Sequence, residues 1–309
     1  MSYTVSSLTD YVDQSSKDLI VALQFESETA SHANIITGVK SSRSLQLLAN
    51  TVNFQDGDSD CAFNASGTTS FTQRDIVTKG IKVQETLCPR ALQAKWTQLL
   101  LRTGQAYDEG DIPKEIIQDY IAQIRKKLEV LDWTGSTVGT FYDGLIKIIK
   151  AASGTTTATA VAGPVTTSNV RTVVQNVVAA VPAVYKGNSD FKIFMGYDVA
   201  EMYRQKMFTD NLYHFVASKD QKGIMAEGSV HEIIPVHGLD GFYGNAGDNP
   251  FIFGLDPKRN LYLGVDMENE EEKVDMWESK DDQNVKFSVR FRRGWQVAYP
   301  SEIVEYSNS

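Results

Sequence analysis

The sequence predicts an α+β fold in one large globular chain. Three observations support this class. An amphipathic helix is expected over residues 114–131, strand-like runs occur on both sides of it, and 309 residues with 42% hydrophobic composition can bury a sizeable core. No repeat is found along the chain, so each segment contributes its own element.

Composition excludes several classes of protein. Thirty basic residues against 39 acidic ones give a net charge of -9, which argues against a protein whose main task is binding a phosphate backbone. Cys61 and Cys88 have no metal-ligand spacing and are too few for a disulfide framework, which favours a reducing compartment. No apolar run approaches the roughly 20 residues needed to cross a bilayer, and the first residues do not resemble a signal peptide.

The first third of the chain predicts elements with little core of their own. Residues 8–25 are interpreted as a short amphipathic helix, and residues 89–101 as another helix. Between them, turn-rich and small-residue stretches precede two strand-like runs at 71–77 and 81–85. This region has too few large apolar residues for a core, so we expect a hairpin that is mobile or laid on another surface.

The middle of the chain contains the clearest helix. Over residues 114–131 the apolar side chains fall on one stripe, Pro113 fits the first turn and Gly135 provides a stop. A Thr, Ala and Gly-rich stretch at 153–168 indicates a subdomain boundary. Beyond it we expect a valine-rich helix from Val170, a strand at 191–195 and a helix capped by Asp198.

The last third predicts strands. They are expected at 232–236, 251–255 and 261–265, the last two joined as a β-hairpin. From Val285 to Tyr306 the pattern predicts long closing strands, with a β-bulge at Gly294.

No catalytic, cofactor or metal residue is assigned. His231 and His237 are too far apart in sequence for the two histidines of a zinc helix and lie in a strand-like run, so ordinary histidines are favoured over a metal site. The Asp56, Asp58 and Asp60 triplet departs from a calcium loop and is interpreted as a solvated turn. The basic cluster from Lys286 to Arg293 is interpreted as a solvated strand face in preference to a nucleic-acid site.

Several segments resemble the major capsid protein of tailed bacteriophages, which has the Hong Kong 97-type fold. The run from Pro113 to Gly135, followed by Phe141-Tyr142-Asp143-Gly144-Leu145, is similar to the spine helix of this family and the turn after it. The run from Phe291 to Val304 is similar to its closing strands. Three further segments resemble capsid proteins of phages that infect Bacteroidota: Phe63 to Gly67, Phe71 to Arg74, and Leu87 to Pro89.

The resemblance implies a division of the chain. Residues 1–48 would be an N-terminal arm and residues 49–85 an extended β-hairpin loop lying on a neighbouring subunit. Residues 86–150, with the spine helix 114–131, would form a peripheral subdomain that is completed by returning strands at 275–309, and residues 151–274 would form an axial subdomain.

The resemblance also implies a function without catalysis or cofactors. The chain would assemble in the host cytoplasm into hexamers and pentamers of an icosahedral virion head that encloses double-stranded DNA. Its partners would be itself, portal, scaffolding and head-decoration or head-completion proteins, and the packaged DNA in non-specific contact, but no membrane. The candidates for contacts between subunits are Phe63, Phe71, Arg74, Ile76, Arg290, Arg292 and Arg293.

Two alternatives stay open. An encapsulin-like shell protein of a cellular nanocompartment would share the fold and package a protein cargo. A small metal-dependent α/β hydrolase would use His231 or His237. Nuclease-protected DNA in particles separates the first alternative from a phage capsid, and metal-dependent activity of a monomer would favour the second.

Overall fold

Two β-sheets organise the chain, together with a projecting hairpin. The computed structural model describes residues 27–56, 65–88, 111–138, 141–210, 224–241, 250–266, 273–279, 281 and 284–307. The five-stranded sheet contains β1 (Asn34–Ile36), β4 (Lys79–Leu87), β10 (Leu261–Val265), β11 (Lys273–Ser279) and β12 (Asn284–Val297). The six-stranded sheet has the order β5 (Thr156–Thr157), β13 (Val304–Tyr306), β9 (Ile252–Leu255), β6 (Lys192–Met195), β8 (Glu232–Pro235) and β7 (Ile224–Met225).

The long helix α3 (Asp111–Thr134) covers one face of the five-stranded sheet and contains the whole predicted helix 114–131. Ile121, Ile124 and Leu128 of its apolar stripe are buried, as a period of 3.6 residues requires of a helix packed on one side. Tyr120 stacks on Phe287 of β12 with 5.5 Å between the ring centroids. The short helix α4 (Leu145–Ala151) follows and also contacts β12.

Strand β12 is the central strand of this sheet, pairing with β10, β11 and β4. Every second residue from Val285 to Val297 is buried, and the pairing continues through Gly294 without an extra residue. The predicted β-bulge at Gly294 is therefore wrong, because the alternation never changes phase. Arg293 consequently belongs to the buried series.

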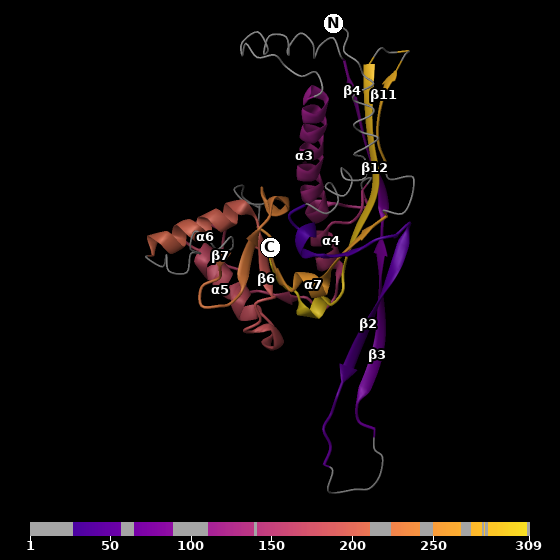
Figure 1. Cartoon of the computed structure of the whole chain (residues 1–309). Helices are drawn as coiled ribbons and strands as arrows, with labels where there is room; N and C mark the ends of the chain where they lie inside the picture. Colours follow the sequence, from indigo (N-terminus) through magenta and orange to yellow (C-terminus); the bar gives the residue numbers. More distant parts are fainter. Residues whose placement is uncertain are drawn as a thin grey trace.

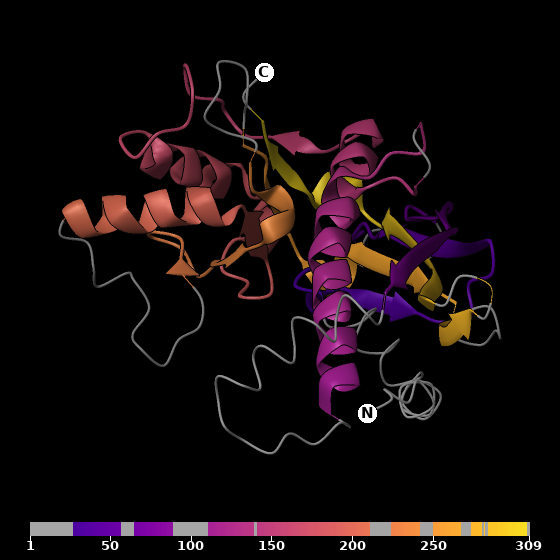
Figure 2. The ribbon, with the colours of Figure 1, turned by 90° about the horizontal axis from the view of Figure 1, so that it is seen from above.

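The six-stranded sheet forms a second core with two helices. Helix α5 (Val170–Ala180) buries Val170, Val173, Val174 and Val177, as the valine spacing predicts. Helix α6 (Tyr197–Thr209) packs beside it. Its N-cap is Gly196, so the prediction of an Asp198 cap is corrected by two positions. Figure 2 shows α5 and α6 on one side of α3 and the strands of the five-stranded sheet on the other.

The hairpin consists of β2 (Ser42–Thr51) and β3 (Thr68–Val77), which pair antiparallel along their full length. It extends away from the rest of the molecule, at the opposite end from the N-terminal turns of α3 (Figure 1). The predicted pairing partners change: β3 pairs with β2, whereas the 81–85 run lies within β4 of the five-stranded sheet. The first strand of the hairpin thus begins at Ser42, within the segment expected to be an arm.

A second predicted hairpin is also wrong. Strands β9 and β10 lie in different sheets and are joined by α7 (Pro257–Asn260). The side chain of Asp256 accepts hydrogen bonds from the backbone N–H groups of Lys258 and Arg259, which caps this short helix. The connector therefore carries the chain from one sheet to the other.

Four short 3-10 turns are also present in the described part of the chain. They are the 3-10 turns η1 (Ala30–His32), η2 (Ala183–Tyr185), η4 (His237–Leu239) and η5 (Pro300–Glu302). The predicted helices over residues 8–25 and 89–101, and Phe63, lie outside the described residues. Among the helices that are described, none combines the length and apolarity needed to cross a bilayer.

Candidate assembly surfaces

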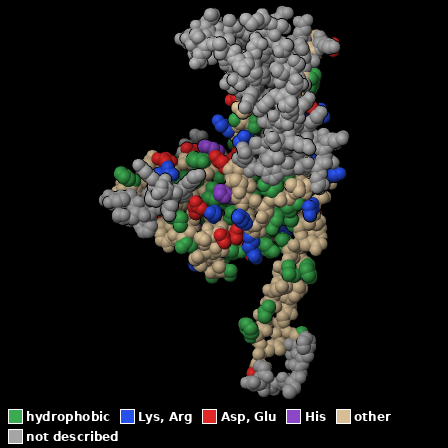
Figure 3. All heavy atoms as spheres, viewed as in Figure 1, with side chains coloured by type: hydrophobic (Ala, Val, Ile, Leu, Met, Phe, Trp, Pro, Cys, Tyr) green, Lys and Arg blue, Asp and Glu red, His purple; other side chains and the backbone are tan. Residues whose placement is uncertain are grey.

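The hairpin exposes apolar side chains that its own chain does not cover. Phe54 is 99% exposed, Val52 76% and Phe71 74%, and Leu48 is also exposed. Hydrophobic side chains mark this narrow projection in Figure 3. Exposed apolar surface on an extended two-stranded element indicates an interaction site, because an isolated hairpin is at best marginally stable in water.

The base of the hairpin is anchored firmly to the five-stranded sheet. Ile76 is fully buried in the protein's own core, which removes it from the surface on which a contact with another subunit was expected. The Thr78 hydroxyl donates to the carbonyl of Val39 at 3.0 Å, and Gln296 Nε2 donates to the carbonyl of Asp75 at 2.7 Å. A β-carbon on Gly294 would overlap the carbonyl oxygen of Val77. Only glycine permits this close approach of hairpin and sheet.

Arg293 is likewise not a surface residue. It is fully buried and forms an ion pair with Asp132 of α3, with 2.5 Å between Nη2 and Oδ2 and 2.9 Å between Nε and Oδ1. Tyr142 and Trp295 also donate hydrogen bonds to Asp132. Burial acts to lower the pKa of Arg293, but the attraction of Asp132 outweighs it and raises this pKa. The expectation of Arg293 as a contact with another subunit is therefore corrected: it fixes α3 to β12.

A second buried carboxylate lies one helical turn from Asp132. Glu129 accepts hydrogen bonds from the backbone N–H of Thr29 at 3.2 Å, from the Thr29 hydroxyl, and from the Trp133 indole at 3.2 Å. Burial, followed by repulsion from Asp132, raises the pKa of Glu129 to about 7. The hydrogen bonds of Glu129 thus tie Thr29 to the C-terminal end of α3.

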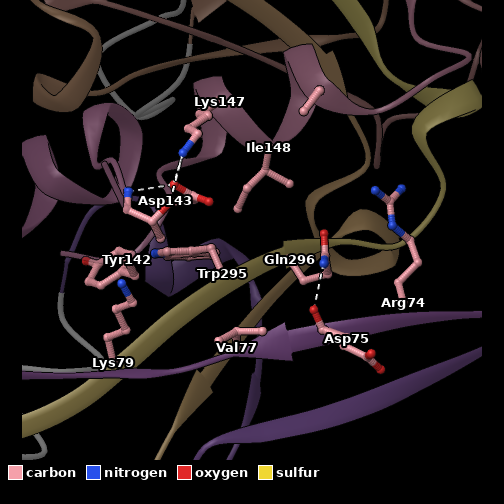
Figure 4. Close-up of a pocket in the computed structure, with 12 residues that line it drawn as sticks. Arg74, Asp75, Val77, Lys79, Tyr142, Asp143, Lys147, Ile148, Trp295 and Gln296 are labelled. Atoms are coloured by element: carbon pink, nitrogen blue, oxygen red, sulfur yellow. Dashed lines mark hydrogen bonds and ion pairs between the residues drawn. The ribbon is translucent and has the colours of Figure 1, made fainter. Parts of the chain in front are cut away.

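A cavity of about 260 Å³ lies where the hairpin meets the body (Figure 4). Val77, Trp295 and Ile148 contribute apolar lining, and Arg74 and Lys147 contribute charge. Burial lowers the pKa of Arg74. The structure thus places the predicted contact residue Arg74 at the hairpin base, whereas Phe71 lies further out, exposed on β3.

The outer face of the sheet, opposite α3, is basic. We call this surface the basic face. The strand pairing puts Lys82 of β4 beside Arg290 of β12, and Trp277 of β11 beside Lys286. Because side chains alternate along a strand, Lys286, Arg290 and Arg292 all point away from the buried series. Arg292 also donates to the carbonyl of Lys40 at 2.8 Å. Arg290 and Arg292 therefore lie on a surface, as expected. Their contact with another subunit stays a prediction.

The two histidines considered for metal chemistry have separate structural roles. His231 is buried, packs edge-on against Phe191 and lies 3.2 Å from the carbonyl oxygen of Asn188. His237 is exposed, stacks on Tyr197 and bonds to Asp240 at 2.7 Å. Within the described ranges, no group of three or more His, Cys, Asp or Glu side chains is arranged to hold a metal ion.

Comparison with known proteins identifies structures with a similar fold. No family model matches the sequence, and no curated protein matches it. Solved structures do match. The capsid protein of a native GTA particle is 15% identical, with 92% of this chain and 91% of that chain covered and a TM-score of 0.62. A chain of the satellite phage P4 procapsid is 9% identical, with 94% and 90% covered and a TM-score of 0.60. A virus-like particle from Pyrococcus furiosus is 13% identical, with 96% and 99% covered and a TM-score of 0.52.

These neighbours show first that the chain has the fold of particle-forming capsid subunits. More particularly, the fold is the Hong Kong 97-type fold of tailed-phage major capsid proteins. The α+β class and the resemblance carried by the spine helix and closing strands are confirmed at the level of the fold. At such low identity the likeness assigns no residue role, which still has to come from this chain's own contacts.

Proposed function

We propose that this chain is the repeating subunit of an icosahedral head that encloses the double-stranded DNA of a tailed phage. Hexamers and pentamers of the chain would form the shell. The observation that carries this proposal is the projecting hairpin, whose exposed Val52, Phe54 and Phe71 require a covering surface, on a chain whose fold matches capsid proteins over more than nine-tenths of its length. Portal, scaffolding and head-completion proteins would be its further partners.

The physical basis is repetition of moderate contacts. A hairpin that lies on the next subunit makes a heterologous contact, and such contacts close into rings when the rotation between copies fits. Within a ring and across a shell, each subunit is held by several neighbours, so individually weak contacts yield a stable container. This mode of association needs an exposed element that is held rigidly by the rest of the subunit. The anchored base holds the hairpin in this way.

The test removes the projecting part of the hairpin only. Deleting residues 46–73 and joining the strands by Asn-Gly closes the ladder at a cross-strand pair and keeps the buried Ile76. We expect a folded monomer, with thermal unfolding close to that of the intact chain, that forms no shells. Shells of normal size from this variant would overturn the proposal. The matched control inserts Asn-Gly at the exposed surface position after Lys186 and should leave assembly intact.

A protein-filled shell is the second candidate. The match to the virus-like particle from Pyrococcus furiosus covers 99% of that chain, although its TM-score of 0.52 is lower than that of the GTA capsid. Particles purified after nuclease treatment separate the two. Protected double-stranded DNA supports the phage head, whereas a stoichiometric protein cargo without DNA supports the nanocompartment.

A further inference from the structure

The cavity at the base of the hairpin is lined by more positive than negative charge. Its volume is about 260 Å³, and its lining comes from the hairpin strand β3, from β4 and β12 of the sheet, and from α4 with the segment before it. Three cationic side chains line it: Arg74 of β3, Lys79 of β4 and Lys147 of α4. Cations that gather around one small cavity repel one another, so a bound anion would relieve the repulsion.

The two carboxylates of the lining do not balance this charge. Asp143 forms an ion pair with Lys147 and accepts a hydrogen bond from the backbone N–H of Thr137 at 2.7 Å. The Asp75 carboxylate accepts a hydrogen bond from the side chain of Gln73 at 3.0 Å. Each carboxylate is thus engaged by its own neighbours, and one of the three cations is neutralised.

Arg74 and Lys79 carry the unbalanced charge. In the part of the chain that the structure describes, neither side chain has a hydrogen-bond or ion-pair partner. Both are partly buried, and burial is the one cause that shifts the pKa of Arg74, which it lowers. A guanidinium that loses part of its hydration without a counter-charge favours an anion, and its planar fork matches the two oxygens of a carboxylate.

The middle of the cavity is apolar. Val77 is 54% exposed, Ile148 is partly buried, and the ring of Trp295 also contributes to the lining. Figure 4 shows these side chains between Arg74 on one side and the two lysines on the other. An inorganic anion would leave this apolar surface in water, whereas a carboxylate with a short apolar body covers it.

We propose that this cavity binds a small carboxylate with an apolar body, of about the size of benzoate. The carboxylate lies against Arg74, and the body lies across Val77 and Ile148. Because the lining comes from both the hairpin and α4, the bound ligand joins the hairpin base to the body. This inference goes beyond the shell function and does not depend on it.

The first experiment measures binding of para-fluorobenzoate to the unassembled full-length chain by fluorine NMR. We expect saturable binding. The neutral para-fluorobenzamide keeps the ring and loses the charge, so it should bind about ten-fold more weakly. Inorganic phosphate at the same concentration should not displace the ligand, because it has no apolar body. Equal binding of the amide, or displacement by phosphate, would overturn the proposal.

Variants locate the binding site. Arg74→Gln should weaken the binding of para-fluorobenzoate about ten-fold, and Lys79→Gln about three-fold, because the first loses a direct contact and the second only a nearby charge. The matched control Arg43→Gln makes the same change on the exposed surface of the same hairpin, outside the cavity lining, and should bind like the parent. Circular dichroism checks that each variant is folded. Unchanged affinity in folded Arg74→Gln would rule out this site.

Hydrogen exchange tests whether the ligand joins the hairpin to the body. The backbone N–H of Thr78 donates to the carbonyl of Ser41 at 2.9 Å at the hairpin base. If the opened base does not bind ligand, a concentration about ten times the Kd should slow exchange of this amide about ten-fold. The amide of Ala200 in α6 should exchange at an unchanged rate. Binding without slower exchange at Thr78 would contradict the coupling, and neither assay depends on shell formation.

Discussion

At the level of single residues, the buried ion pair between Arg293 and Asp132 holds β12 and α3 together. Arg293 and Asp132 are both fully buried, and removing either would leave an uncompensated charge in the core. The sequence contains the signal for this pair, since Arg293 has the same odd-numbered spacing as Val285 to Val297. The prediction of a bulge at Gly294 interrupted this alternation, so Arg293 was placed with the other arginines on a solvated face. Its partner Asp132 has no comparable sequence signal, because a polar residue on a helix is usually exposed.

Glu129 predicts a pH dependence of stability. Its pKa rises from 4.5 to about 7 on folding, so the native state binds a proton more readily than the unfolded chain. The contribution of this group to stability is therefore greatest below pH 4.5 and is lost as the pH rises through 7. At about 1.4 kcal/mol per pKa unit, the full difference is about 3 kcal/mol.

The variant Glu129→Gln removes this titration and keeps an acceptor for Thr29 and Trp133. Urea unfolding of the unassembled chain can be followed by tryptophan fluorescence. Between about pH 5 and pH 8, the free energy of unfolding of the variant should fall by roughly 2 kcal/mol less than that of the parent. The exposed Glu201→Gln serves as the control and should retain the parent's pH dependence. Equal pH dependence of parent and Glu129→Gln would contradict this account.

At the level of elements, the hairpin depends on how closely its base approaches the sheet. Helix 114–131 and the valine-rich helix were predictable because their periodicity is dictated by one buried face. The strand that pairs with β3 could not be predicted. Because β2 is mostly exposed, its sequence shows no alternation of apolar and polar residues that would distinguish it from an arm. The connector from Asp256 to Asn260 was misread as a turn. An Asp followed by Pro also begins a helix, with Asp as the cap and Pro in the first turn.

The close approach at Gly294 gives a prediction for this element. Gly294→Ala places a β-carbon against the backbone of Val77, which cannot yield without moving the hairpin base. We expect a loss of stability of about 1–3 kcal/mol and faster proteolysis within the hairpin. Gly80→Ala is a matched control in neighbouring β4, where an added β-carbon meets nothing within 4 Å. Similar stability of the two variants would contradict the anchoring described here.

At the level of the whole molecule, the fold combines a rigid body with one long projection. The sequence predicted this order of elements through the spine helix and the closing strands, and the structural neighbours agree over almost the full chain. The direction in which the hairpin points could not be predicted, because it follows from the pairing of β2 with β3 and from the pairing of β4, the strand after β3, with β12. Those pairings join residues far apart in sequence, and local patterns do not encode them.

The central claim is that copies of this chain close into a shell through their hairpins. Electron microscopy of particles purified from cells that express the chain with its genomic neighbours tests it most directly. The account predicts closed icosahedral shells of hexamers and pentamers, with the β2–β3 hairpin of each subunit lying across the adjacent one. A chain that stays monomeric, or shells in which the hairpin touches only its own subunit, would contradict it.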